Sequence, residues 1–424
     1  MNVLLVGHAC SPRRGSELAG TWNWAWHLSQ RHQVWVITHP QEREAIEGFV
    51  REHPNGNLHF VWVTVPAWLD PWRPSDPTSH VGLRHYMLWQ RAALRQAVRL
   101  DCQIGIDIVH HVSWGTVSEP PLLWRLGIPF VWGPVGGGQT APSPFRRYFG
   151  SAWRAELIRS VRVRLVPYRP TLRNAVRKTA LTLATNHETA NLLQRAGPCK
   201  PRLFLDSGTL REFLSKDPPE KRGRREFVLL WVGRLQPLKG LPLGLEALAQ
   251  VKQIPFRLLV AGSGPLQQEW ESLAGRVGVG DRTTFMGQVP YDQMPALYRS
   301  ADAFLFTSLR DSFGSQVLEA MAAGLPIVTL NHQGVGAFVP SEAGIKVPVT
   351  NPQETVSTLG QAIGVVLSSE ELRARMGRAA WEFAATQTWE RRAEKMSEWY
   401  AEVVRNKERK SNGFDSPPSS STIS

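Results

Sequence analysis

The sequence predicts an α/β protein made of two doubly wound domains, each a parallel β-sheet with helices on both faces. A chain of 424 residues is too long for one ordinary hydrophobic core and suits two domains. Short apolar runs rich in β-branched residues alternate with helical patterns, which is typical of βαβ units. The alternation pauses at residues 207–225 and then starts again.

The expected strands follow this alternation. They lie at 3–6, 34–38, 58–65, 106–111, 130–132 and 181–184 in the first half and at 227–232, 257–261, 283–286, 303–306 and 327–329 in the second.

A change of composition separates the domains. Residues 207–225 contain glycines, adjacent prolines and many charges, which is typical of a surface linker. We therefore place the first domain at residues 1–206 and the second at 226–388. Open parallel sheets bind ligands beyond the carboxyl ends of their strands, so we expect the two domains to face a central cleft. A helical pattern at 389–404 follows, and the charged, then Ser/Pro-rich residues 405–424 are predicted to be disordered.

Composition limits the class of protein and its surroundings. A hydrophobic content of 42% and a charged content of 20% indicate a soluble globular chain. Its three cysteines form no Cys-x-x-Cys pair, which argues against a disulfide framework or a zinc motif. The sequence shows no signal-peptide pattern and no apolar run of membrane-spanning length, so we expect a cytoplasmic protein. The net charge of +13 is compatible with nucleic acid, an anionic membrane surface or a polyanionic substrate.

The segment after the expected strand 303–306 has the features of a phosphate-binding turn. Gly314 lets the backbone approach a ligand closely, and the following helix directs free amides toward an anion. Asp311 precedes this helix and Glu319 lies about one turn inside it, so the two carboxylates can contact different parts of one extended ligand. The alternative is an ordinary helix start, with Asp311 near the cap and Glu319 solvated.

Two cations follow the expected strand 227–232. A turn at Gly233 brings Arg234 and Lys239 to the carboxyl edge of the sheet. Fixed cations there stabilise the charge that develops on a departing diphosphate, with arginine as a bidentate donor and lysine as a point charge. The alternative is that both are solvated surface side chains.

These two elements carry a family resemblance. The stretch Asp-Ser-Phe-Gly-Ser-Gln-Val-Leu-Glu at 311–319 resembles the Glu-x7-Glu motif of family 4 glycosyltransferases, and Gly233-Arg234…Lys239-Gly240 resembles their Gly-Arg…Lys-Gly element. The resemblance extends to about residue 404. It implies the GT-B fold, with two Rossmann-like domains, an acceptor side in the first, a nucleotide-sugar site in the second, and a final helix at 389–404 that crosses back to the first domain.

The resemblance also implies residue roles. Asp311 contacts hydroxyls of the donor sugar, Glu319 binds the ribose, and the backbone of Phe313, Gly314 and Ser315 contacts the diphosphate or the sugar. Aspartate stands at the first position where the family usually has glutamate, which leaves the donor sugar unassigned.

Further donor contacts are implied for cations and glycines. Gly233, Arg234 and Lys239 bind the diphosphate, and Arg234 and Lys239 join Asp311 in catalysis. The remaining matching positions are Gly15, Gly262, Gly264 and Gly287.

Two adjacent histidines end an expected strand of the first domain. Relatives often read Asp-x-x-His-x-His, and this chain reads Asp107-Ile-Val-His110-His111. Adjacent residues of a strand point to opposite faces, so one of the two is expected to face the cleft. The offset from Asp107 favours His110 as the catalytic histidine, and His111 remains the other candidate. The three glycines at 136–138, after the next strand, are interpreted as a phosphate-binding loop or a lid hinge.

Residues 144–178 hold ten Lys/Arg and a single acid, Glu156, with interleaved aromatics. Nucleic acid, anionic lipid and a solvated basic face are the three interpretations. Since many family 4 enzymes use lipid-linked acceptors, the resemblance favours peripheral contact with the inner face of a membrane, and no nucleic acid is expected.

The sequence thus predicts a retaining glycosyltransferase that moves a sugar from a nucleotide sugar to a glycan or lipid-linked acceptor, in polysaccharide or glycoconjugate synthesis. No metal motif is visible, so we expect cations and helix amides to neutralise the diphosphate without a metal ion or cofactor. The alternatives are a nucleotide-sugar epimerase on the same fold and a non-catalytic nucleotide-sugar-binding protein.

Overall fold

The computed structural model describes residues 1–12, 17–66, 68–70, 83–215 and 227–411. Gly15, most of the predicted linker and residues 412–424 of the predicted tail lie outside the described residues.

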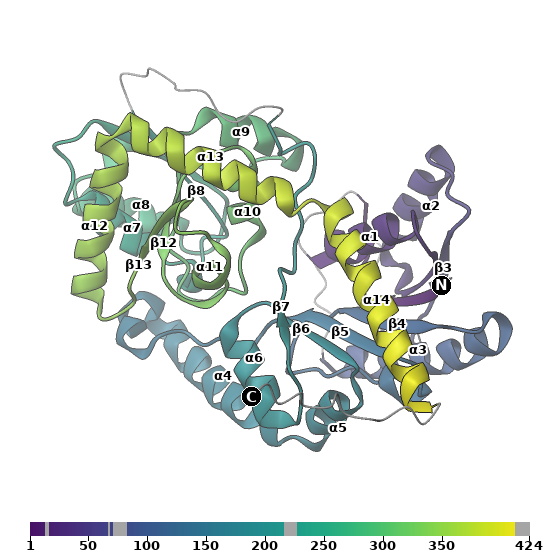
Figure 1. Cartoon of the computed structure of the whole chain (residues 1–424). Helices are drawn as coiled ribbons and strands as arrows, with labels where there is room; N and C mark the ends of the chain where they lie inside the picture. Colours follow the sequence, from purple (N-terminus) through teal and green to yellow (C-terminus); the bar gives the residue numbers. More distant parts are fainter. Residues whose placement is uncertain (13–16, 67, 71–82, 216–226, 412–424) are drawn as a thin grey trace, which may run out of the picture.

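The first domain is built on a seven-stranded parallel sheet in the order β3-β2-β1-β4-β5-β6-β7 (Figure 1). Its strands are β1 (Asn2–Gly7), β2 (Gln33–Thr38), β3 (Leu58–Trp62), β4 (Ile108–Ser113), β5 (Phe130–Val135), β6 (Leu181–Ala184) and β7 (Arg202–Leu203). Its helices are α1 (Glu17–Leu28), α2 (Arg43–Glu52), α3 (Leu83–Ile104), α4 (Trp153–Leu165), α5 (Pro170–Lys178) and α6 (His187–Ala196).

The second domain repeats this plan with a six-stranded parallel sheet in the order β10-β9-β8-β11-β12-β13. Its strands are β8 (Phe227–Val232), β9 (Phe256–Ala261), β10 (Thr283–Gly287), β11 (Ala303–Phe306), β12 (Ile327–Leu330) and β13 (Gly344–Val347). Its helices are α7 (Leu241–Leu248), α8 (Gln267–Arg276), α9 (Met294–Ser300), α10 (Ser315–Ala322), α11 (Gln333–Phe338), α12 (Pro352–Ser368) and α13 (Glu370–Thr386).

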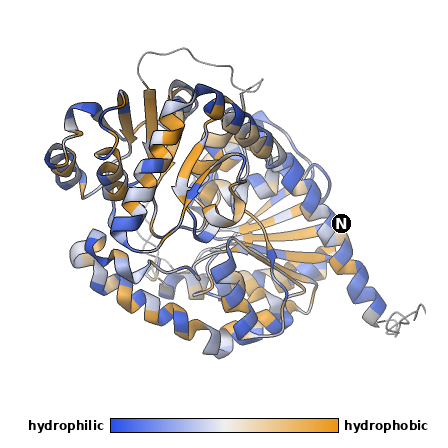
Figure 2. Cartoon of the chain, turned by 60° about the vertical axis from the view of Figure 1, so that its left-hand side comes forward, coloured by the Kyte–Doolittle hydropathy of each residue, from blue (hydrophilic) through white to orange (hydrophobic). Residues whose placement is uncertain are grey.

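Apolar side chains from both faces of each sheet form the cores, as the hydrophobic colour of the strands in Figure 2 shows. In both sheets the strand order reverses beside the first strand of the domain, between β1 and β4 and between β8 and β11. A doubly wound sheet offers a ligand crevice at this reversal. The predicted two-domain α/β architecture is therefore confirmed, and each domain has its ligand-binding edge where the sequence patterns place functional residues.

The last helix, α14 (Trp389–Ser411), belongs to the first domain in space (Figure 1). It follows α13 of the second domain, yet Trp389, Met396 and Tyr400 are buried in a cluster with residues of β1 and α1. The helix continues past residue 404 to Ser411, so the prediction of disorder from residue 405 is wrong for its first seven residues. Of the described helices, none has the length and apolar character that crossing a bilayer requires.

The strands differ from the prediction in two respects, and the first of them affects the site. β4 runs from Ile108 to Ser113 where 106–111 was expected, because its register with β1 continues to the residue pair Gly7 and Ser113. The short strands β7 and β13 were not predicted, since runs of two and four residues carry little periodicity.

Candidate active site

A cavity of about 540 Å³ lies between the two domains. The first domain lines it with residues of α1 and of the segments that follow β4 and β5, and the second with Lys239, Tyr291 and the segment around Asp311 and Glu319. The connection at residues 206–210 forms part of the wall. The cavity therefore lies between the point where strand order reverses in the first sheet and the corresponding point in the second sheet.

The donor-side wall is the turn between β11 and α10. Gly314 has a φ of 95°, and a Cβ atom there would come within 2.9 Å of the Phe306 ring, so the position requires glycine. No side chain caps the start of α10, and Gly314, Ser315 and Gln316 line the cavity. The first amides of this helix are therefore available to an anion in the cavity.

Lys239 and Asp311 form an ion pair at this wall. The Lys239 ammonium contacts the Asp311 carboxylate, and both side chains are about one-fifth exposed. Asp311 also accepts a hydrogen bond from the Ser312 amide, at 3.0 Å, and its own amide donates to Gln333. These contacts hold a cation and a carboxylate side by side next to the start of α10.

Glu319 lies one turn further into α10, with its carboxylate against the cavity. The Tyr298 hydroxyl donates a 2.8 Å hydrogen bond to it. Burial raises the pKa of Glu319 to about 7, and the hydrogen bonds from Tyr298 and Ser315 oppose this rise. The carboxylate therefore holds a proton in the folded protein at a pH where it would be ionised in the unfolded chain.

This raised pKa predicts a pH-dependent gain in stability for Glu319→Gln. Ionising the buried carboxylate above about pH 7 costs free energy of folding, and glutamine keeps the shape and can still accept from Tyr298. The gain in the free energy of unfolding is expected to be on the order of 2 kcal/mol larger at about pH 8.5 than at about pH 5. Urea denaturation at both pH values measures it. Glu371→Gln, at an exposed position of α13, is the control, and an equal pH dependence in both variants would contradict the prediction.

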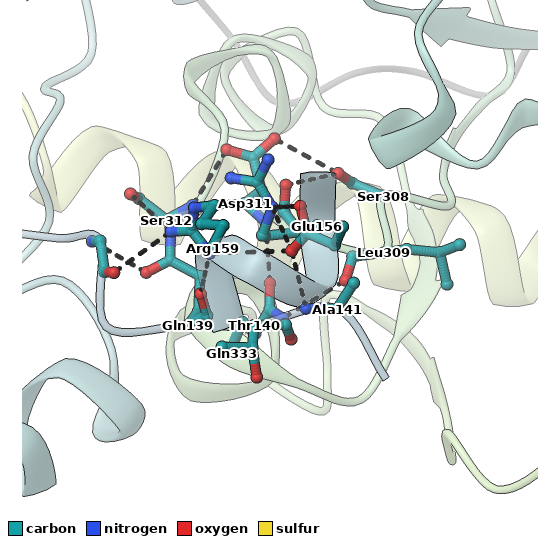
Figure 3. Close-up of polar contacts among 12 residues, drawn as sticks. Gln139, Thr140, Ala141, Glu156, Arg159, Ser308, Leu309, Asp311, Ser312 and Gln333 are labelled. Carbon is teal, nitrogen blue, oxygen red and sulfur yellow. Dashed lines mark hydrogen bonds and ion pairs between the residues drawn. The ribbon is translucent and has the colours of Figure 1, made fainter. Parts of the chain in front are cut away.

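Polar contacts connect the two domains beside the donor wall (Figure 3). Glu156 of α4 is buried and pairs with Arg310 of the second domain at 3.0 Å. Gln139 donates to the Ser312 hydroxyl at 3.3 Å, and Gln333 donates to the Thr140 carbonyl at 3.1 Å. Glu156, the single acid of the basic stretch, is thus used in a contact between the domains.

The glycine loop 136–138 belongs to the same contact. A Cβ atom at Gly136 would lie 2.5 Å from the Ser312 hydroxyl, and one at Gly138 would lie 2.6 Å from the Thr189 backbone. Arg159 donates to the carbonyls of Gly137 and Gln139 at 3.2 and 2.8 Å. The glycines therefore allow this loop to pass close to the donor turn.

Neither His110 nor His111 lines the cavity, so the prediction that one of them faces it is wrong. His110 contacts the Tyr400 hydroxyl and the Gly133 carbonyl, both at 2.6 Å, and His111 contacts the Tyr86 hydroxyl at 2.9 Å. Both rings are fully buried, and burial lowers the pKa of His110 to about 4 and that of His111 to about 3. Because β4 extends two residues further than expected, Val112 and Trp114 line the cavity instead.

The other predicted donor residues separate into two groups. Lys239, Asp311, Gly314, Ser315 and Glu319 line the cavity together. The second group lies outside its lining and consists of Gly233, Arg234, Gly262, Gly264, Gly287 and Phe313.

Most residues of the second group that are described next lie in tightly packed surroundings, and Arg234 lies at the surface. The Phe313 ring is fully buried and packs on Phe338, so any donor contact there is limited to its backbone. Gly262 and Gly264 allow close packing, since Cβ atoms there would lie 2.0 Å from the Gly233 carbonyl and 2.5 Å from that of Leu235. Arg234 is exposed at the end of β8.

Asp206 is a cavity residue that the sequence did not indicate. Burial and the charge of Asp311 raise the pKa of Asp206 to about 6, and the Arg392 guanidinium opposes this rise. Arg392 is itself buried, and its guanidinium lies 4.0 Å from the centre of the Phe204 ring. These partners come from the connection and from α14, and no local motif links them.

Residues 214–383 match the family model described as Glycosyl transferases group 1. The chain is 33% identical over 204 residues to a D-inositol 3-phosphate glycosyltransferase of Corynebacterium efficiens, which covers 44% of this chain and 47% of that protein. It is 36% identical over 129 residues to the uncharacterized glycosyltransferase MJ1607 of Methanocaldococcus jannaschii, which covers 30% and 33%. The match thus spans less than half the length of these curated relatives.

Solved structures resemble the whole chain. Sucrose-phosphate synthase from Thermosynechococcus elongatus superposes with a TM-score of 0.62 at 17% identity, over 96% of this chain and 99% of that one. Anabaena Alr3699/HepE, in complex with UDP, superposes with a TM-score of 0.61 at 17% identity, over 95% and 100%. At this identity the likeness shows the shared fold, two facing Rossmann-like domains, which is the predicted GT-B architecture.

Proposed function

We propose that the protein is a retaining glycosyltransferase that uses a nucleotide-sugar donor, and the match of residues 214–383 to the family model described as Glycosyl transferases group 1 supports this. One observation carries this proposal. Lys239, Asp311 and Glu319 line one interdomain cavity together with the uncapped start of α10. A cation and free helix amides suit a diphosphate, and the two carboxylates suit the hydroxyls of a sugar and a ribose.

The proposed reaction takes place at the anomeric carbon of the donor. The bond from this carbon to the diphosphate oxygen breaks, and the acceptor oxygen forms its bond on the same face. The acceptor proton passes to the departing phosphate oxygen, which leaves a nucleoside diphosphate. Lys239 and the α10 amides stabilise the charge that develops on this leaving group. Asp311, which pairs with Lys239, can accept a hydrogen bond from a sugar hydroxyl when the diphosphate lies beside the lysine.

The acceptor is assigned to the first-domain side of the cavity, where Trp114, Gln139 and Asp206 lie. We propose a glycan or a lipid-linked acceptor there. The neighbouring helix α4 supports the lipid-linked class, because it carries an exposed apolar stripe.

This stripe consists of Leu157, Ile158, Val161 and Leu165, which are each about half exposed. At about 100° per residue they cover a stripe roughly 100° wide, which Arg162 and Arg164 flank on its two sides. Apolar side chains between arginines are typical of a helix that lies in the interface of an anionic membrane.

Vesicle binding tests this membrane contact. The full protein is expected to sediment with vesicles that contain phosphatidylglycerol and less with pure phosphatidylcholine, with weaker binding at high salt. Val161→Glu is expected to reduce binding several-fold, because it places an anion in the stripe. Val365→Glu is the matched control, since Val365 of α12 is 51% exposed and Val161 is 47% exposed. Equal binding by both variants would contradict the membrane contact.

A thermal-shift panel of nucleotide sugars tests the proposed function, because a ligand of the folded state raises the melting temperature. At least one donor is expected to raise it for the wild type and not for Glu319→Ala, and the wild type should slowly hydrolyse that donor. A shift without hydrolysis or transfer would favour a non-catalytic binding protein. Conversion of the free nucleotide sugar to an isomer would favour an epimerase. No shift with any donor would overturn the proposal.

A further inference from the structure

Three histidines and an aspartate gather inside the first domain, one layer behind the cavity wall. His39 follows β2, Asp70 follows β3 and His85 lies in α3. Nε2 of His39 is 2.9 Å from the Asp70 carboxylate and Nε2 of His85 is 3.3 Å from it. Their side chains are 1%, 11% and 3% exposed. The His8 ring stacks on that of His39 with centroids 5.2 Å apart.

Ring nitrogens of two of these histidines, His8 and His85, are unsatisfied among the described residues. Nε2 of His8 and Nδ1 of His85 are buried and have no hydrogen-bond partner there. The contact from Nε2 of His85 to Asp70 is close but does not have hydrogen-bond geometry. An unsatisfied buried polar atom is costly, and a bound ion is a common reason for one. Two such rings lie next to each other, with centroids 5.5 Å apart, and one of them adjoins the Asp70 carboxylate, which points to a bound ion.

The spacing of the donor atoms matches a transition metal. One ligand atom from each of His39, Asp70 and His85 lies within 4.8 Å of the other two. Ligand atoms about 2.0–2.2 Å from a tetrahedral zinc ion lie roughly 3.3 Å from one another. His39 Nε2 lies 2.9 Å from Oδ2 of Asp70, and His85 Nε2 lies 3.3 Å from the other oxygen, Oδ1, so the carboxylate is within this range of both imidazoles. Two imidazoles and one carboxylate, with a fourth position open, form a ligand set that zinc accepts.

We propose that His39, Asp70 and His85 bind one zinc ion. The ion takes the place of the proton between His39 and Asp70 and neutralises the buried carboxylate. A neutral imidazole offers the lone pair that such an ion needs. The His8 ring lies beside both histidine ligands, with its centroid 5.2 Å from that of His39 and 5.5 Å from that of His85.

The ion would connect three parts of the chain that adjoin the acceptor side of the cavity. It ties the end of β2 and the start of α3 to Asp70, in the connection between β3 and α3. The His8 ring lies 5.9 Å from that of Trp114, a residue of the cavity wall. The site is separate from Lys239 and Asp311, so the ion has a structural role and takes no part in neutralising the diphosphate.

Metal content and cobalt spectroscopy test this site without donor or acceptor. Tag-free full-length protein with Cys102→Ser, which removes an exposed thiol, is dialysed against a weak chelator and analysed by mass spectrometry. About one zinc ion per chain is expected, and Co²⁺ added to the metal-free protein should give the visible absorption of a four-coordinate ion. Zinc is also expected to raise the melting temperature.

His85→Gln and Asp70→Asn are expected to weaken zinc binding at least tenfold. Changing a residue that only contacts a metal ligand already lowers metal affinity by about 10- to 100-fold, and these variants change the ligands themselves. His59→Gln is the matched control, a half-buried histidine of the same domain that stacks on Trp35. Equal zinc content in His85→Gln, Asp70→Asn and His59→Gln would overturn the site. If both ligand variants fail to fold, the wild-type cobalt spectrum decides, and six-coordinate or absent Co²⁺ overturns it.

Discussion

Lys239→Ala is expected to lower the rate of glycosyl transfer about 100-fold or more. The ammonium is fixed at the cavity by Asp311 and lies beside the start of α10, where a diphosphate would carry its developing charge. Removal of one fixed donor to such a charge typically costs about 10²–10³ in kcat. The fold should persist, because the Asp311 carboxylate left behind is 21% exposed to solvent and keeps its hydrogen bond from the Ser312 amide.

Steady-state kinetics with the donor that the thermal-shift panel identifies measure this effect, and circular dichroism confirms folding. Arg276→Ala is the matched control, because Arg276 is an exposed cation at the end of α8 in the same domain. Arg234→Ala tests whether the diphosphate site extends beyond the cavity lining. A loss equal to that of Lys239→Ala would mean that the diphosphate reaches beyond the cavity lining to Arg234. Turnover of Lys239→Ala within threefold of wild type would contradict the placement of the diphosphate.

Gly262→Ala is expected to destabilise the second domain by on the order of 3 kcal/mol. Gly262 has a φ of 136°, and its amide donates to the Gly287 carbonyl at 2.7 Å. An added Cβ would lie 2.0 Å from the Gly233 carbonyl, so the loops after β8 and β9 would have to separate. Backbone strain and overpacking each cost about 1–3 kcal/mol.

Gly275→Ala is the internal control for this change. Gly275 lies within α8, and a Cβ there meets no atom within 4 Å. Alanine in a helix interior is expected to add about 0.5–1 kcal/mol of stability. Urea denaturation of both variants gives the comparison. Equal stability of Gly262→Ala and wild type would show that the backbone at Gly262 is not held as described.

The fold was predictable because it follows from local patterns. Buried parallel strands such as β8 and β11 are short runs of apolar residues, and the helices between them show their own periodicity. The limits of this reasoning appear at β4. Its predicted end was two residues early, and that shift was enough to suggest that His110 and His111 reach the cleft.

The donor wall was predictable for a related reason. Asp311, Gly314 and Glu319 belong to one turn and the helix that follows it. The regular geometry of that helix fixes their relative positions, so the sequence alone indicates that they lie close together. Asp206, Glu156 and the cluster of His39, Asp70 and His85 are different. Their partners come from other elements and often from the other domain, so their roles depend on the tertiary structure.

The chain passes between the domains twice, and the two passages touch. The Thr209 amide and hydroxyl each donate, at 2.8 Å, to carbonyls at the end of α13, Gln387 and Ala384. Gly208 lies against the Trp389 ring. Any relative motion of the domains that keeps these contacts is a rotation about an axis through the two passages of the chain. The contact of Glu156 with Arg310 also joins the two domains, so a rotation that separates them to admit a large acceptor has to break this mostly buried ion pair.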